Sequence, residues 1–335
     1  MDRVSDQCDR LDRAIHQAAA GVPVWATVIR VDPSPDTGPP RFETIHYRDS
    51  ATAIDFWPAS VVKLYTCVAA FVWCNQLGIP DDAVFRFQRP AEPDGPNPDG
   101  GWLTDCTRTL PEMCSNIFRE SANEDYTLLL RLLGPDWLNE RFLTPANGFA
   151  RTALQRGYIH DPPHRFTPQE AQRIEIYALG DRPRRLHTRE HTWSGVSHAA
   201  RLGQTLIDRA INNCSSTGDM AECMRRLMFH ESLPPAERFD LTPAQLELLR
   251  EGRDGFTGLR NTRWTWAWAD AIAEVLPDAR FYHKSGNIST HYLDLVYVSD
   301  EASDTHFIGA VATASGSDAA CRRIFRAIAR TLLRR

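Results

Sequence analysis

The sequence is almost without lysine: only two of its 38 Lys and Arg residues are lysines, Lys63 and Lys284. An arginine side chain keeps its proton in proteins, whereas burial can lower the pKa of a lysine until the amine becomes a base near neutral pH. A codon bias toward arginine explains the many arginines, but it does not explain why these two positions are lysines. Both are therefore candidates for acid–base chemistry.

The chain also lacks a run of 18 apolar residues and a cluster of basic residues, and its formal net charge is −5. The first absence predicts no membrane-spanning helix. The second argues against a nucleic-acid partner, because phosphate contacts need grouped Lys and Arg. The N-terminal segment MDRVSDQCDRLDR has no apolar stretch typical of a secretion signal, so we expect a cytoplasmic protein without membrane contact.

Metal and disulfide patterns are missing as well. The eight cysteines are scattered without a C-x-x-C pair, which favours buried free thiols. His187 and His191 are four residues apart, a spacing that can bind zinc, but the general base of an H-E-x-x-H motif is absent. Surface or capping histidines are the more plausible interpretation. We expect no metal and no cofactor.

What is present suits one globular domain, since 335 residues with 42% hydrophobic composition can form a full core. Short apolar strands are expected at residues 24–30, 42–47, 281–284, 293–299 and 306–312. Helices are expected at residues 2–20, 58–77, 123–133, 199–210, 221–228, 242–250 and 318–333, the last with Ile324, Phe325, Ile328 and Leu332 on one face. A capping box, Thr109-Leu110-Pro111-Glu112, predicts the start of a further helix. Strands at both chain ends predict an α+β fold: a five-stranded antiparallel sheet flanked by terminal helices, with an inserted all-helical lobe. The α/β lobe would comprise residues 1–57 and 278–335, and the helical lobe residues 58–277.

Three short motifs contain residue types that can take part in catalysis. The first is Ser60-Val61-Val62-Lys63, which places the serine and the amine on one face in the first turn of an apolar helix. A neutral Lys63 within reach could take the Ser60 proton. The second motif is Ser121-Ala122-Asn123 between two helices, where Asn123 has an alternative reading as an N-cap. The third is Lys284-Ser285-Gly286 at the end of a strand.

Each motif alone is weak evidence for an active site. However, both lysines of the chain lie in motifs that require a lysine. The order S-x-x-K, S-x-N, K-[ST]-G resembles that of the active-site serine penicillin-recognising family. The segments FWPASVVKLYTCVAA and LPEMCSNIFRESANEDYTLLLRLLG look like the nucleophile helix and the S-x-N unit of that family. The resemblance covers about residues 22–335 and is nearest to the class A β-lactamases. It implies the same two-lobed fold, with the site between the lobes.

The resemblance also implies roles for individual residues. Ser60 would attack a carbonyl carbon, Lys63 would act as its base, and Ser121 would pass the proton to the leaving group. The backbone N–H groups of Ser60 and Asn287 would form the oxyanion hole. The implied substrate-binding residues are Asn123, Lys284, Ser285, Gly286 and Asn287.

Three departures from the family pattern concern function. Class A β-lactamases have a Glu that activates the deacylating water, but residues 148–161 contain none and offer only Tyr158, His160 and Asp161. Thr127 stands where that branch has an Asn that braces the same loop. An acid, Asp294, lies near the position where an Arg often binds a substrate carboxylate.

The sequence therefore predicts a serine hydrolase or acyltransferase that acts on an amide, ester or β-lactam carbonyl and deacylates β-lactams poorly. Its partners would be a small acyl substrate, with an amine as an alternative acceptor to water, and the chain would be a monomer. Two alternatives stay open: a binder or sensor that is acylated once, and a true β-lactamase with an unrecognised base.

Overall fold

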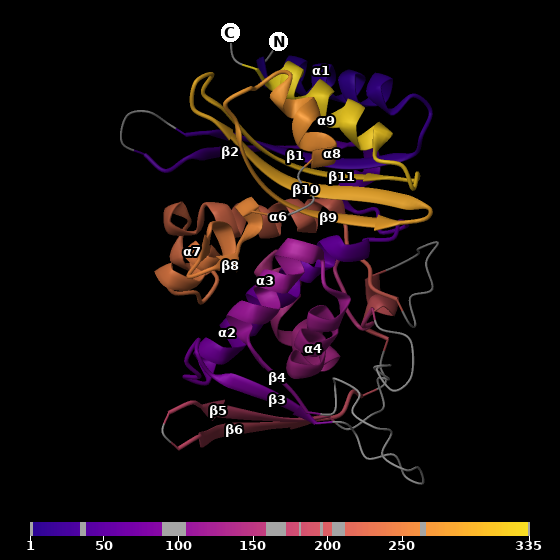
Figure 1. Ribbon diagram of the computed structural model, residues 1–335. Coiled ribbons are helices and arrows are strands. Elements are labelled where there is room, and N and C mark those ends of the chain that lie inside the picture. The colour runs from indigo at the N-terminus through magenta and orange to yellow at the C-terminus, as the bar shows by residue number, and fades with distance from the viewer. Residues whose placement is uncertain are drawn as a thin grey trace.

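The computed structural model describes residues 3–33, 38–88, 105–158, 172–180, 182–194, 197–202, 212–261 and 266–333. A five-stranded antiparallel sheet lies at its centre, with the strand order β2-β1-β11-β10-β9 (Figure 1). Its strands are β1 (Val24–Asp32), β2 (Arg41–Tyr47), β9 (Arg280–Ile288), β10 (His291–Asp300) and β11 (Thr305–Thr313). The strands from the two ends of the chain meet where β1 pairs with β11. The predicted α+β fold and its five-stranded sheet are therefore confirmed.

One face of this sheet is covered by the terminal helices (Figure 1). They are α1 (Arg3–Ala19), α8 (Trp266–Ala273) and α9 (Ala319–Leu332). The apolar stripe expected on the last helix is buried, with Ile324, Phe325 and Ile328 all inaccessible to solvent. Helix α9 lies close to the sheet because β11 has Gly309 beneath it, where a Cβ would come within 2.8 Å of the Phe325 ring.

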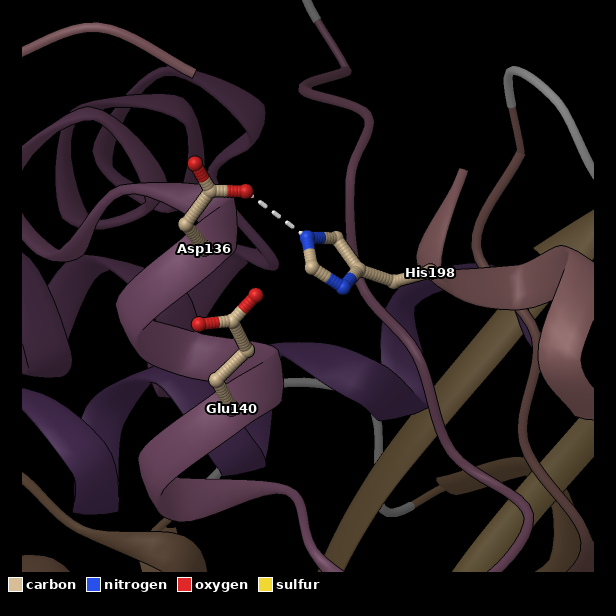
Figure 2. A group of neighbouring side chains, drawn as sticks. All are labelled: Asp136, Glu140 and His198. Atoms are coloured by element: carbon tan, nitrogen blue, oxygen red, sulfur yellow. Dashed lines mark hydrogen bonds and ion pairs between the residues drawn. The ribbon is translucent and has the colours of Figure 1, made fainter. Parts of the chain in front are cut away.

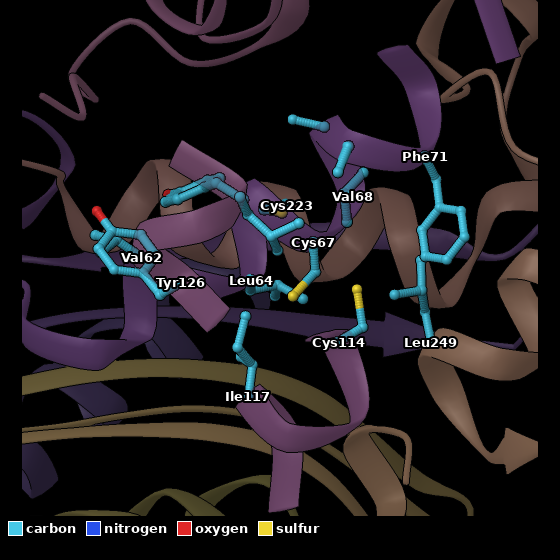
Figure 3. Packing of buried hydrophobic residues seen from close by; sticks show 14 of the residues in the cluster. Val62, Leu64, Cys67, Val68, Phe71, Cys114, Ile117, Tyr126, Cys223 and Leu249 are labelled. Carbon is cyan, nitrogen blue, oxygen red and sulfur yellow. The ribbon is translucent and has the colours of Figure 1, made fainter. Parts of the chain in front are cut away.

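The other face of the sheet packs against the inserted lobe (Figure 1). The helices of this lobe are α2 (Lys63–Gln76), α3 (Leu110–Glu120), α4 (Asn123–Leu133), α5 (Pro135–Trp137), α6 (Thr217–Met228) and α7 (Pro243–Arg250). Helix α2 runs through the middle and buries every residue from Lys63 to Cys74. Figure 3 shows Cys67, Val68 and Phe71 of this helix among side chains from the neighbouring helices. A helix buried on all sides explains its uninterrupted apolar sequence.

The expectation of an all-helical lobe is wrong. The lobe contains a four-stranded sheet in the order β4-β3-β5-β6 and a short hairpin of β7 and β8. The strands are β3 (Val84–Gln88), β4 (Asp105–Thr109), β5 (Gln172–Ala178), β6 (Arg184–His191), β7 (Gly252–Arg253) and β8 (Phe256–Thr257). Strand β6 has the sequence RRLHTREH, which lacks apolar alternation, and it becomes a strand by pairing with β5.

The cysteines that the structure describes as free are Cys8, Cys67, Cys74, Cys114, Cys214, Cys223 and Cys321, all buried except Cys8. Of the helix expected at residues 199–210, the structure describes a short 3-10 turn, His198–Leu202, and the remainder lies outside the described residues. Within the described part of the chain, no helix has the length and apolar character needed to cross a membrane.

Helix α3 begins at the predicted capping box. The Thr109 hydroxyl accepts a hydrogen bond from the Glu112 backbone N–H, and the Glu112 carboxylate accepts one from the Thr109 backbone N–H at 2.7 Å. Both bonds satisfy N–H groups that the first helical turn leaves free. The box therefore fixes the start of the helix that ends at Ser121.

Replacing Thr109 with Ala removes the cap, and we expect it to lower the free energy of unfolding by about 1 kcal/mol. Thr109→Ser keeps the hydroxyl and should lose much less. Urea denaturation followed by circular dichroism measures both. Equal stability of Thr109→Ala and the unaltered protein would contradict a stabilising role of the box.

Candidate active site

Ser60 lies in a 3-10 turn, Ala59–Val62, that leads directly into α2. The preceding Ala59 has a φ of +45°, a left-handed conformation that costs a residue with a Cβ on the order of 1–2 kcal/mol. The Ala59 carbonyl oxygen accepts a hydrogen bond of 2.7 Å from the Tyr158 hydroxyl. This bond anchors the peptide group whose N–H belongs to Ser60.

Strand β9 presses against the same turn from the other side. It is the edge strand of the sheet, and a Cβ on Gly286 would lie 2.9 Å from the Ser60 nitrogen and 3.1 Å from the Val61 nitrogen. Only glycine allows this approach without displacing backbone. The predicted S-x-x-K and K-[ST]-G motifs are therefore in direct contact.

Lys63 is fully buried at the start of α2. Its ammonium donates to the Ser121 carbonyl oxygen, to Ser121 Oγ at 3.2 Å and to Asn123 Oδ1 at 2.6 Å. Burial, followed by repulsion from Lys284, lowers the pKa of Lys63 well below its ordinary value. The amine can therefore become neutral and accept a proton. Among the described residues, the Ser60 hydroxyl makes no hydrogen bond, so Lys63 is held by the S-x-N motif rather than by Ser60.

Ser121 connects the two lysines. It ends α3 with a φ of +55°, and its Oγ accepts from Lys284 Nζ at 2.9 Å as well as from Lys63. A hydroxyl has two lone pairs and one proton. With both lone pairs occupied by amines, the Ser121 proton is directed away from them.

Asn123 is the first residue of α4, so it does not cap that helix. Its side chain lies over Lys63, which makes the N-cap reading wrong.

Lys284 enters from β9 and is almost completely buried. It also donates to the Ser285 carbonyl oxygen at 2.7 Å. Burial lowers the pKa of Lys284 to about 8, although the nearby Asp294 carboxylate opposes this shift. The amine is thus a cation at neutral pH that can still lose its proton.

Asp294 is not at the position that the sequence suggested. It is buried beneath the sheet edge on β10, and one of its carboxylate oxygens is 3.0 Å from His283 Nδ1. It lines neither part of the cleft described next. Asp294 acts on the charge of Lys284 rather than on a bound ligand.

The cleft above these groups has two chambers, which share Ser60, Asn123 and Asn287 in their walls. The larger, which we call the Asp318 chamber, has a volume of about 540 Å³. Its other lining residues are Ser121, Ser285, Gly286, Tyr292, Gly316, Ser317 and Asp318. The smaller, the Arg156 chamber, has a volume of about 420 Å³. Its other lining residues are Trp57, Ala59, Arg156, Tyr158 and Ile288.

The segment that carries the deacylating Glu in class A β-lactamases is described here to Tyr158, and His160 and Asp161 lie outside the described residues. Thr127 was expected to leave this segment without a brace, and that expectation is wrong. Its hydroxyl accepts from the Tyr158 backbone N–H at 3.1 Å and donates to the Asn123 carbonyl oxygen at 2.8 Å. Burial raises the pKa of Tyr158 to about 12, so the phenol stays protonated.

Sequence reasoning missed Asn213, which holds the same segment. Its Oδ1 accepts from the backbone N–H groups of Gln155 and Arg156, both at 2.9 Å. Its Nδ2 donates to the Arg156 carbonyl oxygen and to the Tyr126 hydroxyl. No motif surrounds Asn213, so only the tertiary structure identifies its role.

One group of possible metal ligands lies elsewhere in the described chain. Asp136, Glu140 and His198 place their ligand atoms within 4.8 Å of one another (Figure 2). Asp136 already accepts from Ser194 and lies 2.8 Å from His198 Nε2. The Asp136 carboxylate is therefore hydrogen-bonded to protein groups, and none of Asp136, Glu140 and His198 lines the cleft.

The two histidines of the zinc-like spacing lie on strand β6 rather than on a helix. The ring of His187 lies against Trp73, with 5.9 Å between centroids. His191 contacts the Arg131 carbonyl oxygen, and burial lowers its pKa to about 4. Both histidines therefore pack against protein groups rather than against each other.

No protein-family model matches the sequence, and a comparison with curated protein sequences gives no match. Solved structures do match over almost the whole chain. A β-lactamase from Sphaerobacter thermophilus DSM 20745 is 15% identical with a TM-score of 0.58, covering 96% of this chain and 94% of that one. PBP-A is 14% identical with a TM-score of 0.60 and the same two coverages. A β-lactamase from Desulfarculus baarsii DSM 2075 is 16% identical, with a TM-score of 0.58 and 98% of both chains covered.

At these identities the likeness establishes the fold. It covers both lobes and therefore includes the segments that bring the three motifs together. The chain has the β-lactamase and penicillin-binding-protein fold that its motifs resemble.

Proposed function

We propose that this protein is a serine hydrolase or acyltransferase that forms an acyl-enzyme on Ser60. One observation carries the proposal. Lys63, Ser121 and Lys284 come from three distant parts of the chain and form one buried hydrogen-bonded group directly below the cleft that Ser60 lines. Two buried amines that share one hydroxyl are costly to place, and structural ion pairing does not account for them, which favours a catalytic role.

Acylation begins with Ser60 Oγ attacking the carbonyl carbon of an ester, amide or β-lactam. The proton of the hydroxyl passes to neutral Lys63, and the tetrahedral oxyanion receives hydrogen bonds from the Ser60 and Asn287 backbone N–H groups. As the bond to the leaving group breaks, the Ser121 proton moves to the leaving atom and Lys63 returns a proton to Ser121. The products are the ester of Ser60 and the protonated leaving group.

The binding residues support this sequence. Lys284 stays cationic and holds Ser121 Oγ, Asn123 orients the Lys63 amine, and Ser285 lines the chamber beside them. Strand β9 is the edge strand of the sheet, and Gly286 lines the Asp318 chamber with Ser60, so a substrate can lie along this strand edge.

Deacylation needs water or an amine to attack the Ser60 ester. Residues 148–158 contain no carboxylate, and Tyr158 stays protonated, so this segment provides no base for water. An amine acceptor needs only the lysines and Ser121. A variant of PBP-A, which shares this fold, has been solved as an acyl-enzyme complex with penicillin G. These points favour slow β-lactam hydrolysis, and a once-acylated binder remains the second candidate.

Penicillin G should acylate Ser60 and remain attached, because no group among residues 148–158 can activate water. Intact-mass spectrometry should show a stable adduct of one equivalent, while steady-state hydrolysis is slow and activated esters turn over faster. Ser60→Ala should give no adduct and keep its circular dichroism spectrum. Rapid penicillin turnover without an adduct, or labelling of Ser60→Ala, would exclude the proposed chemistry.

Lys63→Arg should be as inactive as Lys63→Ala, because a guanidinium cannot accept the Ser60 proton. The expected loss in the rate of Ser60 acylation is on the order of 10²–10⁴-fold for either variant. Stopped-flow release of p-nitrophenolate measures the rate, and thermal unfolding shows whether the variants are folded. Near-normal acylation by Lys63→Arg would mean that Lys63 contributes only positive charge.

The rate should depend on pH in a bell shape. Lys63 acts when neutral, so acylation should rise with pH through the lowered pKa of Lys63. Lys284 acts as a cation, so the rate should fall again above its pKa of about 8. The profile of kcat/KM for a neutral ester between pH 5 and 10 tests this. In Lys284→Arg the cation persists, and the alkaline fall should disappear. If the rate of that variant still falls at alkaline pH, the fall is due to the titration of another group.

A further inference from the structure

The Arg156 chamber contains an arginine that is held in place and has no acidic partner in the part of the chain that the structure describes. Its guanidinium Nη1 donates to Asn212 Oδ1 at 2.5 Å, and Asn212 is buried. No carboxylate among the described residues forms an ion pair with Arg156, whereas Arg225 and Arg226 pair with Glu222 and Arg151 donates to the Leu202 carbonyl oxygen. The remaining N–H groups of this guanidinium are available to a ligand.

The backbone of Arg156 is fixed more firmly than that of a typical loop residue. Its N–H donates to Asn213 Oδ1, and its carbonyl oxygen accepts from Asn213 Nδ2 and from the Tyr126 hydroxyl, with all three distances between 2.9 and 3.0 Å. Asn213 and Tyr126 are buried. A side chain on such a backbone is preorganised, which reduces the entropy lost when it binds a ligand.

The position of Ser121 assigns the two chambers to the two halves of a substrate. Ser121 lines the Asp318 chamber and does not line the Arg156 chamber. In the proposed function Ser121 protonates the leaving atom, so the leaving group occupies the Asp318 chamber. The acyl group then extends into the Arg156 chamber, between Trp57 and Ile288.

We infer that the acyl group of the substrate carries an anion, most simply a carboxylate, that binds Arg156. A guanidinium forms two parallel hydrogen bonds with a carboxylate, and Trp57 and Ile288 give the chamber apolar surface for the carbon chain of the acyl group. The opposite chamber carries Asp318, which directly precedes α9 and makes no side-chain cap bond to it. Among the described residues, the one cation that pairs with its carboxylate is Arg322, at 3.9 Å. A leaving or accepting amine fits that side. The inference rests on the proposed function, because it uses the Ser60 acyl-enzyme to assign the chambers.

The test compares two p-nitrophenyl esters of the same length. One is the monoester of glutaric acid, with a terminal carboxylate, and the other has a terminal carboxamide in its place. The unaltered protein should favour the carboxylate ester in kcat/KM by on the order of tenfold or more, the range of a charged hydrogen bond. Arg156→Gln should bring this ratio close to one, and Arg156→Lys should retain part of it.

Arg151→Gln is the matched control. It makes the same change of charge five residues away, at an arginine that bonds the Leu202 carbonyl oxygen and lines neither chamber. The ratio should stay unchanged in this variant. A ratio near one in the unaltered protein, or the same ratio in Arg156→Gln, would overturn the inference while Ser60 acylation still supports the proposed function.

A binding experiment tests the anion site independently of Ser60 acylation. Ser60→Ala cannot be acylated, so its affinity for glutaric acid monoanilide and for the neutral carboxamide analogue reports the chamber alone. Calorimetry should show on the order of tenfold tighter binding of the acid, and adding Arg156→Gln should remove the difference. A difference here without acylation of Ser60 in the active protein would retain the anion site and reject the function. Equal affinities would reject the anion site.

Discussion

The site depends on the burial of two amines beside one hydroxyl. Lys63 and Lys284 both bond Ser121 Oγ, and both are nearly inaccessible to water. Two ammonium groups this close repel each other strongly where the dielectric is low. The pair therefore favours one positive charge over two. The nearby Asp294 favours charge on Lys284, whereas burial and repulsion from Lys284 lower the pKa of Lys63 well below its ordinary value. This difference is the reason that the proposed mechanism uses the amine on α2 as the base and the amine on β9 as the cation.

Contacts elsewhere in the fold stabilise the strained backbone on which these groups depend. Ala59 and Ser121 both have positive φ values, and each lies at a helix end that carries a reactive group. Tyr158 bonds the Ala59 carbonyl oxygen, and Gly286 lets β9 pack against the Ser60 N–H side of the same peptide. A hydrogen bond to a peptide oxygen polarises its N–H. The Tyr158 contact can thus orient and strengthen the Ser60 N–H as a donor, which the proposed oxyanion hole requires.

The sequence predicted the parts of the structure whose pattern is local. Helix α2, the capping box of α3 and the five strands of the central sheet each have a clear apolar period or cap, and the structure contains all of them. The two lysines pointed to the site because composition made them rare. Strand β6 was missed because its charged sequence takes its conformation from β5. Asn213 and the bracing role of Thr127 were missed because their partners are distant in sequence or belong to the backbone.

The same contacts explain why hydrolysis of the acyl-enzyme and its transfer to an amine would need different catalytic groups. In the proposed mechanism, an amine acceptor enters the chamber that the leaving group vacates, and Ser121 and Lys63 work in reverse, as microscopic reversibility requires. Water that attacks from the Arg156 chamber would need its own base. The Tyr158 hydroxyl cannot serve, because its proton is donated to Ala59 and its pKa is about 12. The hydrogen bond that fixes the turn of Ser60 thus occupies the Tyr158 hydroxyl. In the proposed mechanism, this favours transfer of the acyl group to an amine over its hydrolysis.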